Sequence, residues 1–279
     1  MTTTAPAPSA QSAAPVHRTV EVQPVSQRRV IASEWVKFRT LRSSWITMGV
    51  AVAALALLGL LIGVITNANW AHLDPARAAN FNAVDTSLRG INFAQLAIAV
   101  LGVLVISGEY STGMIRSSLG AVPKRLPVLW AKLLVFGAAT FVLMEIAAFA
   151  AFWLGQAGLA THGTTLSAPG ALRSVIGTGL YLTVVGVLSV ALGFIIRSTA
   201  GGISVVIGLL LVLPGIMNVL PQSWQDHISP YLPSNAGAVI TTVNADPGSL
   251  APWTGFGVFC LYAAVAVAIS AVLLNRRNA

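Results

Sequence analysis

The sequence predicts an all-α membrane protein with six transmembrane helices and both termini in the cytoplasm. Three observations support this fold class. Of the 279 residues, 56% are hydrophobic and only 9% are charged, whereas a soluble domain carries about 25% charged residues. The apolar residues gather into six long runs, each suited to cross a bilayer as a helix. The basic residues lie mainly on one side of these runs.

The six apolar runs are separated by polar or glycine-rich segments. The second is somewhat short, and the third is long enough to tilt or to project beyond the bilayer. Pro214 and Gly215 are expected to bend the fifth run near its end. The runs span residues 46–65, 91–107, 127–154, 172–196, 203–220 and 253–274.

The distribution of lysine and arginine predicts the orientation. If the chain crosses the membrane at each run, thirteen basic residues lie on one side: Arg18, Arg28, Arg29, Lys37, Arg39, Arg42, Arg116, Lys124, Arg125, Lys132, Arg197, Arg276 and Arg277. Three lie on the other side: Arg77, Arg89 and Arg173. Because basic residues accumulate on the cytoplasmic side, we expect the side with thirteen of them to face the cytoplasm. The expected location is the cell (plasma) membrane. Anionic lipid accounts for these charges, so nucleic acid is not an expected partner.

The N-terminal region divides into a tail and an amphipathic helix. Residues 1–27 are rich in Ala, Pro, Thr and Ser, without apolar periodicity, which predicts a disordered cytoplasmic tail rather than a signal peptide. In residues 28–43, Ile31, Trp35 and Phe38 fall on one side of a helix flanked by basic residues, which favours a helix lying in the membrane interface. The alternative is a cytosolic extension of the first span. Residues 28–279 then form one six-helix transmembrane domain.

The segment at residues 109–125, after the second span, predicts a short amphipathic helix on the cytoplasmic surface. Ser111 or Thr112 is expected to cap it, and Glu109 would suit the positive end of its dipole. Ile115, Leu119 and Val122 would form its apolar side, and Arg116 points elsewhere. Two interpretations remain open: a lipid-facing connector, or a docking helix for a cytoplasmic partner.

This segment carries a family resemblance. The run EYSTGMIRSSL, from Glu109 to Leu119, resembles the signature after the second span of ABC-2 type transporter permeases, the membrane subunits of ABC exporters. The preceding SEWVKFRTLRSSW resembles the N-terminal interfacial helix of that family, and the six-span layout is similar too. The resemblance covers residues 28–277. Met114 stands where threonine is common.

The resemblance implies a function. In that family, two permease chains pair with two cytoplasmic nucleotide-binding ATPase subunits, and the loop after the second span acts as a coupling helix. The resemblance assigns the ATPase-coupling role to five residues of this loop: Glu109, Gly113, Ile115, Arg116 and Leu119. The sequence contains no G-x-x-x-x-G-K-[ST] phosphate loop. The chain is therefore expected not to be an enzyme and to bind no cofactor, the ATP being bound by a partner subunit.

Other candidate residues lie within the spans. Glu145 is an acid well inside the third run; it is either a substrate-pathway or proton-relay residue or, as we favour, a packing carboxyl hydrogen-bonded to a neighbouring helix. Gly59 and Gly63 form a G-x-x-x-G pattern in the first run. The resemblance places that run near the interface with a second permease chain, in a homodimer or heterodimer, and packing within the chain is the alternative.

The segment 221–252, on the outer side, mixes aromatic residues and prolines. Ser234 or Asn235 is expected to cap a short helix over residues 236–242. Such a segment suits shallow re-entry into the membrane, a lid over an exit path, or an aromatic belt at the interface.

The leading functional hypothesis is thus the permease subunit of an ATP-driven exporter. Few charges within the spans favour a hydrophobic or amphipathic substrate. The alternative is a secondary transporter or channel that works without ATP, with Glu145 titrating. An intramembrane enzyme is disfavoured because no nucleophile–base pair is recognisable. The four histidines are far apart in sequence, so no metal site is expected.

Overall fold

A computed structural model describes residues 26–122, 124–245 and 248–276 of the chain, without the side chains of Arg77, Leu119 and Ala121. The predicted tail, residues 1–27, lies outside this part of the chain except for its last two residues. Within the described residues the secondary structure is entirely helical. Six helices in this part are long and apolar enough to cross a membrane, which confirms the predicted fold class.

The six spans match the six apolar runs. The first four are α2 (Arg42–Ala68), α5 (Ile91–Ser111), α7 (Leu126–Leu159) and α8 (Ala171–Ile196). The fifth consists of α9 (Thr199–Ile207), a π-helical turn (Gly208–Val212) and α10 (Leu213–Met217), and the sixth is α13 (Pro252–Arg276). At about 1.5 Å per residue, the 34 residues of α7 extend about 51 Å, well beyond the roughly 30 Å of a hydrocarbon core.

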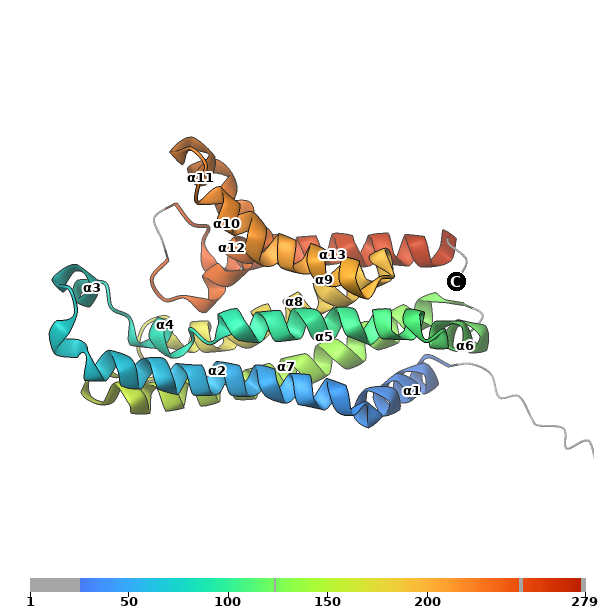
Figure 1. Cartoon of the computed structure of the whole chain (residues 1–279), viewed down its shortest axis with the longest axis horizontal. Coiled ribbons are helices and arrows are strands. Elements are labelled where there is room, and N and C mark those ends of the chain that lie inside the picture. Colours follow the sequence, from blue (N-terminus) through green and yellow to red (C-terminus); the bar gives the residue numbers. More distant parts are fainter. Residues whose placement is uncertain (1–25, 123, 246–247, 277–279) are drawn as a thin grey trace, which may run out of the picture.

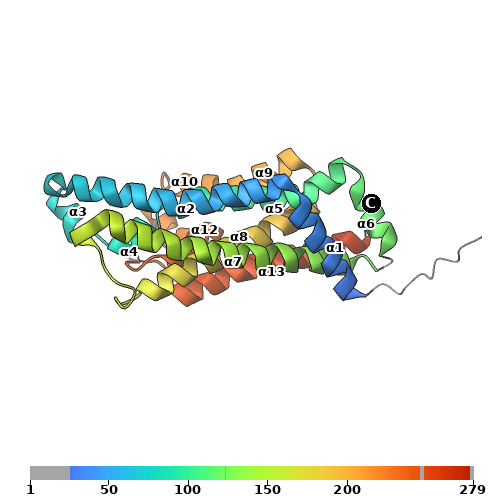
Figure 2. The same cartoon turned by 90° about the horizontal axis from the view of Figure 1, so that it is seen from below.

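Shorter helices lie at the two ends of the bundle (Figure 1). One end carries α1 (Gln27–Thr40), α6 (Met114–Ala121) and the end of α13, and we call it the α6 end. The opposite end, the α3 end, carries α3 (Pro75–Ala79), α4 (Ala83–Ser87) and α11 (Gln222–Ile228). The α8 helix runs through the centre and contacts α5, α7 and α13 (Figure 2). It is therefore the most buried of the six spans.

Small residues bring α2 and α7 into close contact. Gly59 and Gly63 of α2 are both buried, and a Cβ at Gly63 would lie 2.6 Å from the backbone oxygen of Gly155 in α7. A Cβ at Gly59 would meet the backbone oxygen of Ser87. Of the two interpretations of these glycines, the contacts support packing within the chain, because both glycines face α7 and α4 of their own chain. Close backbone approach explains why glycine is needed there.

The irregularity predicted at Pro214 and Gly215 begins earlier in the fifth span. The α-helix changes to a π-helical turn over Gly208–Val212, directly before the helical turn that contains Pro214. Proline donates no backbone hydrogen bond and its ring collides with the preceding turn, so the preceding residues adopt wider i→i+5 pairing.

The segment 221–252 packs into the bundle through α12 (Pro233–Ala238). Helix α12 begins at Pro233 and is preceded by Leu232, so the predicted caps, Ser234 and Asn235, lie inside the helix instead. Proline suits the first helical position because it has no backbone N–H to leave unpaired. Gly237 lies against Phe259 and Tyr181, and the segment is thereby wedged between α13 and α8.

The helix predicted over residues 28–43 is present as α1 and ends at a break at Leu41 before α2. Its buried residues are Val30, Glu34 and Phe38, whereas Trp35 is 44% exposed. Of the predicted apolar side, Phe38 is therefore buried in the bundle, Ile31 is partly buried and Trp35 is exposed. The buried side also includes a charged residue, Glu34, which has partners on other helices.

We expect Gly63→Ala to lower the free energy of unfolding by about 1–3 kcal/mol, since the added methyl group would force two backbones apart. Gly49→Ala in the same helix is the matched control, because a Cβ there meets no atom within 4 Å. The melting temperature of the purified protein measures both effects. Equal melting temperatures for the two variants would contradict the close α2–α7 contact.

Candidate functional site

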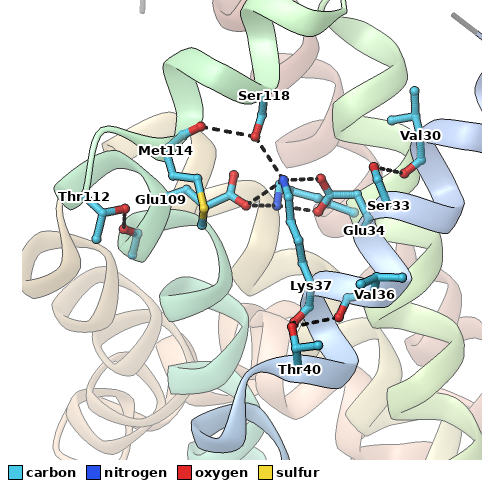
Figure 3. Close-up of polar contacts among 12 residues, drawn as sticks. Val30, Ser33, Glu34, Val36, Lys37, Thr40, Glu109, Thr112, Met114 and Ser118 are labelled. Atoms are coloured by element: carbon cyan, nitrogen blue, oxygen red, sulfur yellow. Dashed lines mark hydrogen bonds and ion pairs between the residues drawn. The ribbon is translucent and has the colours of Figure 1, made fainter.

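Four charged side chains meet at the α6 end. Glu34 and Lys37 come from α1 and Glu109 comes from α5 (Figure 3). Lys132 comes from α7. The Lys132 Nζ atom lies 2.6 Å from Glu34 Oε2 and 2.7 Å from Glu109 Oε1. The Lys37 Nζ atom lies 2.7 Å from Glu34 Oε1 and 3.2 Å from Glu109 Oε1. We call these four residues the charge cluster.

Burial makes the charge cluster a strong constraint. Glu34 and Glu109 are 5% exposed and Lys132 is 3% exposed. Removing such a charge from water costs several kcal/mol, and only a close, well-oriented partner of opposite charge offsets that cost. Two carboxylates and two ammonium groups balance each other here. The relative positions of α1, α5 and α7 at this end are therefore fixed by four mutually dependent side chains.

Lys37 extends the charge cluster to α6. Its Nζ atom donates a hydrogen bond of 2.9 Å to Ser118 Oγ. Burial lowers the pKa of Lys37, but its hydrogen bonds and charge interactions with Glu34 and Glu109 outweigh burial and raise the pKa above the ordinary value. Lys37 therefore stays protonated at physiological pH, which preserves the link between α1 and α6.

The turn between α5 and α6 depends on Gly113. Its φ angle is +73°, in the left-handed region that glycine enters at little cost, and it directly precedes the first residue of α6. A Cβ there would meet no atom within 4 Å, so the requirement is for backbone conformation rather than for space. This explains the glycine of the signature in physical terms.

The predicted polar start of α6 is wrong. Ser111 and Thr112 do not cap α6, because both hydroxyl groups donate back to the Gly108 carbonyl oxygen in α5, at 3.0 and 2.8 Å. Glu109 lies in the last turn of α5 rather than at the start of α6. Helix α5 continues past the predicted end at residue 107 because the lysines of the charge cluster neutralise Glu109.

The α6 helix is amphipathic, as predicted. Ile115 is 3% exposed, and Val122, just beyond the helix, is 7% exposed. Arg116 and Ser117 face solvent. The side chain of Leu119, which the sequence placed on the apolar side, lies outside the described structure. Helix α6 thus packs against the bundle through Ile115 and presents Arg116 outward.

A mostly apolar cavity of about 230 Å³ lies beside the charge cluster. It is lined by side chains of the cluster and by apolar residues of α1, α5 and α7, including Phe38, Leu104 and Phe136. Met114, the first residue of α6, also lines it. The start of α6 therefore borders open space rather than a filled core.

Glu145 is not part of the charge cluster. It lies 13 residues after Lys132 on α7, which is about 20 Å along the helix. Its carboxyl group packs against Gly179 of α8, and neither of its oxygens has a hydrogen-bond partner among the described residues. The interpretation that we favoured, a carboxyl hydrogen-bonded to a neighbouring helix, is therefore wrong.

Sequence reasoning missed Glu34, Lys37, Lys132 and Ser118 as site residues. One available signal was Lys132, which lies about 9 Å along α7 from its first residue, within an apolar run. A lysine there needs a partner, and Glu34 and Glu109 are acids from neighbouring segments. The contact of Lys132 with Glu34 depends on how α1 folds back onto α7. The periodicity of apolar residues in the sequence does not determine that arrangement.

The α3 end is held by hydrogen bonds to backbone groups. Asp85, just after the start of α4, accepts the Val243 N–H at 2.7 Å, and Arg173 donates to the Thr242 carbonyl oxygen at 2.8 Å. Burial raises the pKa of Asp85 despite these backbone hydrogen bonds. A polar cavity of about 1070 Å³, lined in part by Asn82, Asp85 and Arg89, opens beside these contacts.

The chain matches the model of a known protein family. The model of the ABC-2 family transporter protein matches residues 30–215, two thirds of the chain. The chain belongs to the ABC-2 transporter family. The match includes all four residues of the charge cluster, the turn at Gly113, the first four spans of this ABC-2 protein and most of the fifth. A search of curated proteins found no match.

Family membership makes this ABC-2 protein a membrane transport subunit, a class that is typically not itself the ATPase and generally works with one. It also supports a multi-pass membrane location. The resemblance inferred from the run between Glu109 and Leu119 is thereby confirmed. The signature glycine forms the turn, and the signature acid anchors it to the rest of the bundle.

We expect Lys132→Met to lower the free energy of unfolding by about 3–5 kcal/mol, because it leaves two buried carboxylates with one ammonium group. Combining it with Glu109→Gln restores the charge balance, since Glu34 then pairs with Lys37 alone. The double variant should therefore be more stable than the sum of the single effects predicts. Melting temperatures of the three variants measure this coupling, and strictly additive losses would contradict it.

Proposed function

We propose that the chain is the membrane-spanning permease subunit of an ATP-driven ABC exporter in the cell membrane. In this proposal it works with a separate nucleotide-binding ATPase subunit and a second permease chain. It moves a hydrophobic or amphipathic substrate out of the cytoplasm. The observation that carries the proposal is the charge cluster, which connects the surface helix α6 to three helices at once.

The orientation follows from charge. Thirteen of the sixteen lysine and arginine residues fall on the side of the spans that carries α1 and α6. Because cytoplasmic loops carry an excess of basic residues, we place the α6 end and both termini in the cytoplasm. A cytoplasmic ATPase would then meet α6 and the outward-facing Arg116.

The contacts suggest how a push on α6 would reach the spans. Lys37 Nζ contacts both Ser118 of α6 and the carboxylates of the charge cluster, so a displacement of α6 acts on α1. Gly113 joins α6 directly to α5, whose Glu109 is held by Lys132 of α7. The cavity beside Met114 provides room for the start of α6 to shift. Coupling then means that α1, α5 and α7 move together.

In this proposal the work of the chain is mechanical, and ATP is bound by the partner subunit. Glu109 serves as a positioning residue inside the bundle, whereas Arg116 is the residue that meets the partner. Ile115 acts from the opposite side of α6, by packing against the bundle.

The fifth span is the best candidate surface for the second permease chain. Only 22% of its most apolar window is buried in the chain, against 33–61% for the other five spans. It exposes Leu211, Val212 and Ile216 around the π-helical turn. Gly59 and Gly63 of the first span do not take part, because α7 and α4 cover them.

Cross-linking from Arg116 tests the proposal. In a Cys260→Ser background, Arg116→Cys carrying a thiol-to-amine cross-linker in native membranes should capture a subunit that contains a Walker A sequence, identified by mass spectrometry. Ser223→Cys, exposed on α11 at the opposite end, is the matched control and should capture none. Failure of capture from Arg116, or equal capture from both positions, would reject the proposed docking site.

A second candidate function, a secondary transporter that works without ATP, is favoured by one observation: neither Glu145 oxygen has a hydrogen-bond partner among the described residues. Under the exporter proposal, Glu145→Gln should leave the melting temperature unchanged or higher, because a neutral amide costs less to bury than a carboxylate. It should also leave ATP-dependent transport of an amphipathic dye unchanged in reconstituted membranes that contain the ATPase.

The secondary-transporter candidate makes the opposite prediction. Vesicles holding this chain alone should then accumulate the dye on a proton gradient without ATP, and Glu145→Gln should abolish that accumulation. Absence of gradient-driven accumulation in the wild type would reject this candidate.

A further inference from the structure

Two cavities on the surface formed by α7, α8 and α13 meet at Trp130. The first, of about 600 Å³, lies at the α6 end and is lined by Lys124, Arg125, Leu126, Pro127, Trp130 and Asn275. The second, of about 520 Å³, continues along the spans and is lined only by tryptophan, valine, alanine and cysteine side chains of the same three helices. We call them the basic cavity and the apolar groove.

The basic cavity has the chemistry of an anion site. Its two charged lining residues, Lys124 and Arg125, are both cationic, and no carboxylate of the described residues lines it. Arg125 Nη1 donates to the Leu274 carbonyl oxygen at 3.2 Å, which ties the start of α7 to the end of α13 and forms one rim of the cavity. The ammonium group of Lys124 is exposed and makes no hydrogen bond or salt bridge with any described residue.

The apolar groove has the chemistry of a site for a hydrocarbon chain. Val187 of α8, and Cys260, Ala264 and Ala268 of α13, are among the side chains that line it. The alanines leave a channel between larger side chains on the bilayer-facing side of these spans. Since α8 contacts both α7 and α13, and Val184 and Val187 of α8 line the groove, α8 forms the floor of the channel.

Trp130 lines both cavities and so joins them, near the start of α7. It lies four residues into α7 and is 50% exposed. Tryptophan is enriched at membrane–water interfaces, because its ring is apolar and its N–H is polar. The three features therefore match a phospholipid from one end to the other. The basic cavity corresponds to the headgroup, Trp130 to the interface, and the apolar groove to an acyl chain.

We propose that this surface is a binding site for one anionic phospholipid of the leaflet at the α6 end. The phosphate-bearing headgroup lies in the basic cavity near Lys124, and one acyl chain lies in the apolar groove. The charges select an anionic headgroup over a zwitterionic one, because each lysine or arginine near the surface adds attraction to anionic lipid. The bound lipid would bridge α7 and α13, which otherwise contact each other mainly through α8.

Native mass spectrometry of the purified full-length chain with added phosphatidylglycerol or phosphatidylcholine tests the site. The wild type should bind one phosphatidylglycerol per chain more tightly than phosphatidylcholine. Lys124→Gln should weaken phosphatidylglycerol binding by about fivefold and leave phosphatidylcholine binding unchanged. Ala264→Trp, which fills the apolar groove, should weaken binding of both lipids.

Val265→Trp is the matched control for the groove, because Val265 is 49% exposed on the same helix and does not line the groove. It should bind both lipids like the wild type. Equal binding of the two lipids by the wild type would overturn the proposal. Equal losses from the Ala264 and Val265 variants would overturn it as well. So would loss of a dimer with lipid binding intact in Ala264→Trp, since the groove would then hold a second copy of the chain.

Melting temperatures provide a second measurement that also checks folding. Phosphatidylglycerol should raise the melting temperature of the wild type and of Val265→Trp, and should raise that of Ala264→Trp much less. If Ala264→Trp does not fold, Ala268→Trp fills the same groove and replaces it. Equal stabilisation of the groove variant and its control would overturn the proposal.

Discussion

Two lysines and two glutamates at the α6 end determine how the helices meet there. The buried members of the charge cluster depend on one another, because the cost of burying each charge is offset only by its partners. Their backbones belong to α1, α5 and α7, which are far apart in the sequence. This arrangement determines where α5 ends and how α1 packs on the bundle. It also attaches α6 through Ser118.

Close backbone packing plays the corresponding role along the spans. Glycines allow the backbones to approach more closely than side chains would permit. Gly63 lies against Gly155 of another span, and Gly177 lies against Ile240 of the segment 221–252. Apolar side chains gain little by leaving lipid for a helix interface, so dense packing of small residues supplies much of the attraction. The result is a bundle whose central helix, α8, is enclosed, while the fifth span remains largely uncovered.

The two kinds of contact suit different tasks. A packed glycine interface resists sliding, because a shift brings backbone atoms into collision. An ion-pair cluster beside a cavity can transmit displacement as a unit, because its members hold one another while the neighbouring space is open. Under the proposed function, the partner ATPase would therefore act on the α6 end, which combines the cluster, the glycine turn and the cavity.

The sequence by itself determined the six spans, the amphipathic α1 and α6, and the family signature, because each is a local pattern of hydrophobicity or of adjacent residue types. It also supported the expected orientation through the uneven distribution of lysine and arginine. Only the tertiary structure decided which side of α1 is buried, where Glu109 points and what Gly59 and Gly63 contact. These depend on partners 50 or more residues away or on another helix: Lys132 draws Glu34 inward, and α7 covers the glycines of α2. No local pattern carries that information, since the pairing energy exists only once the helices have met.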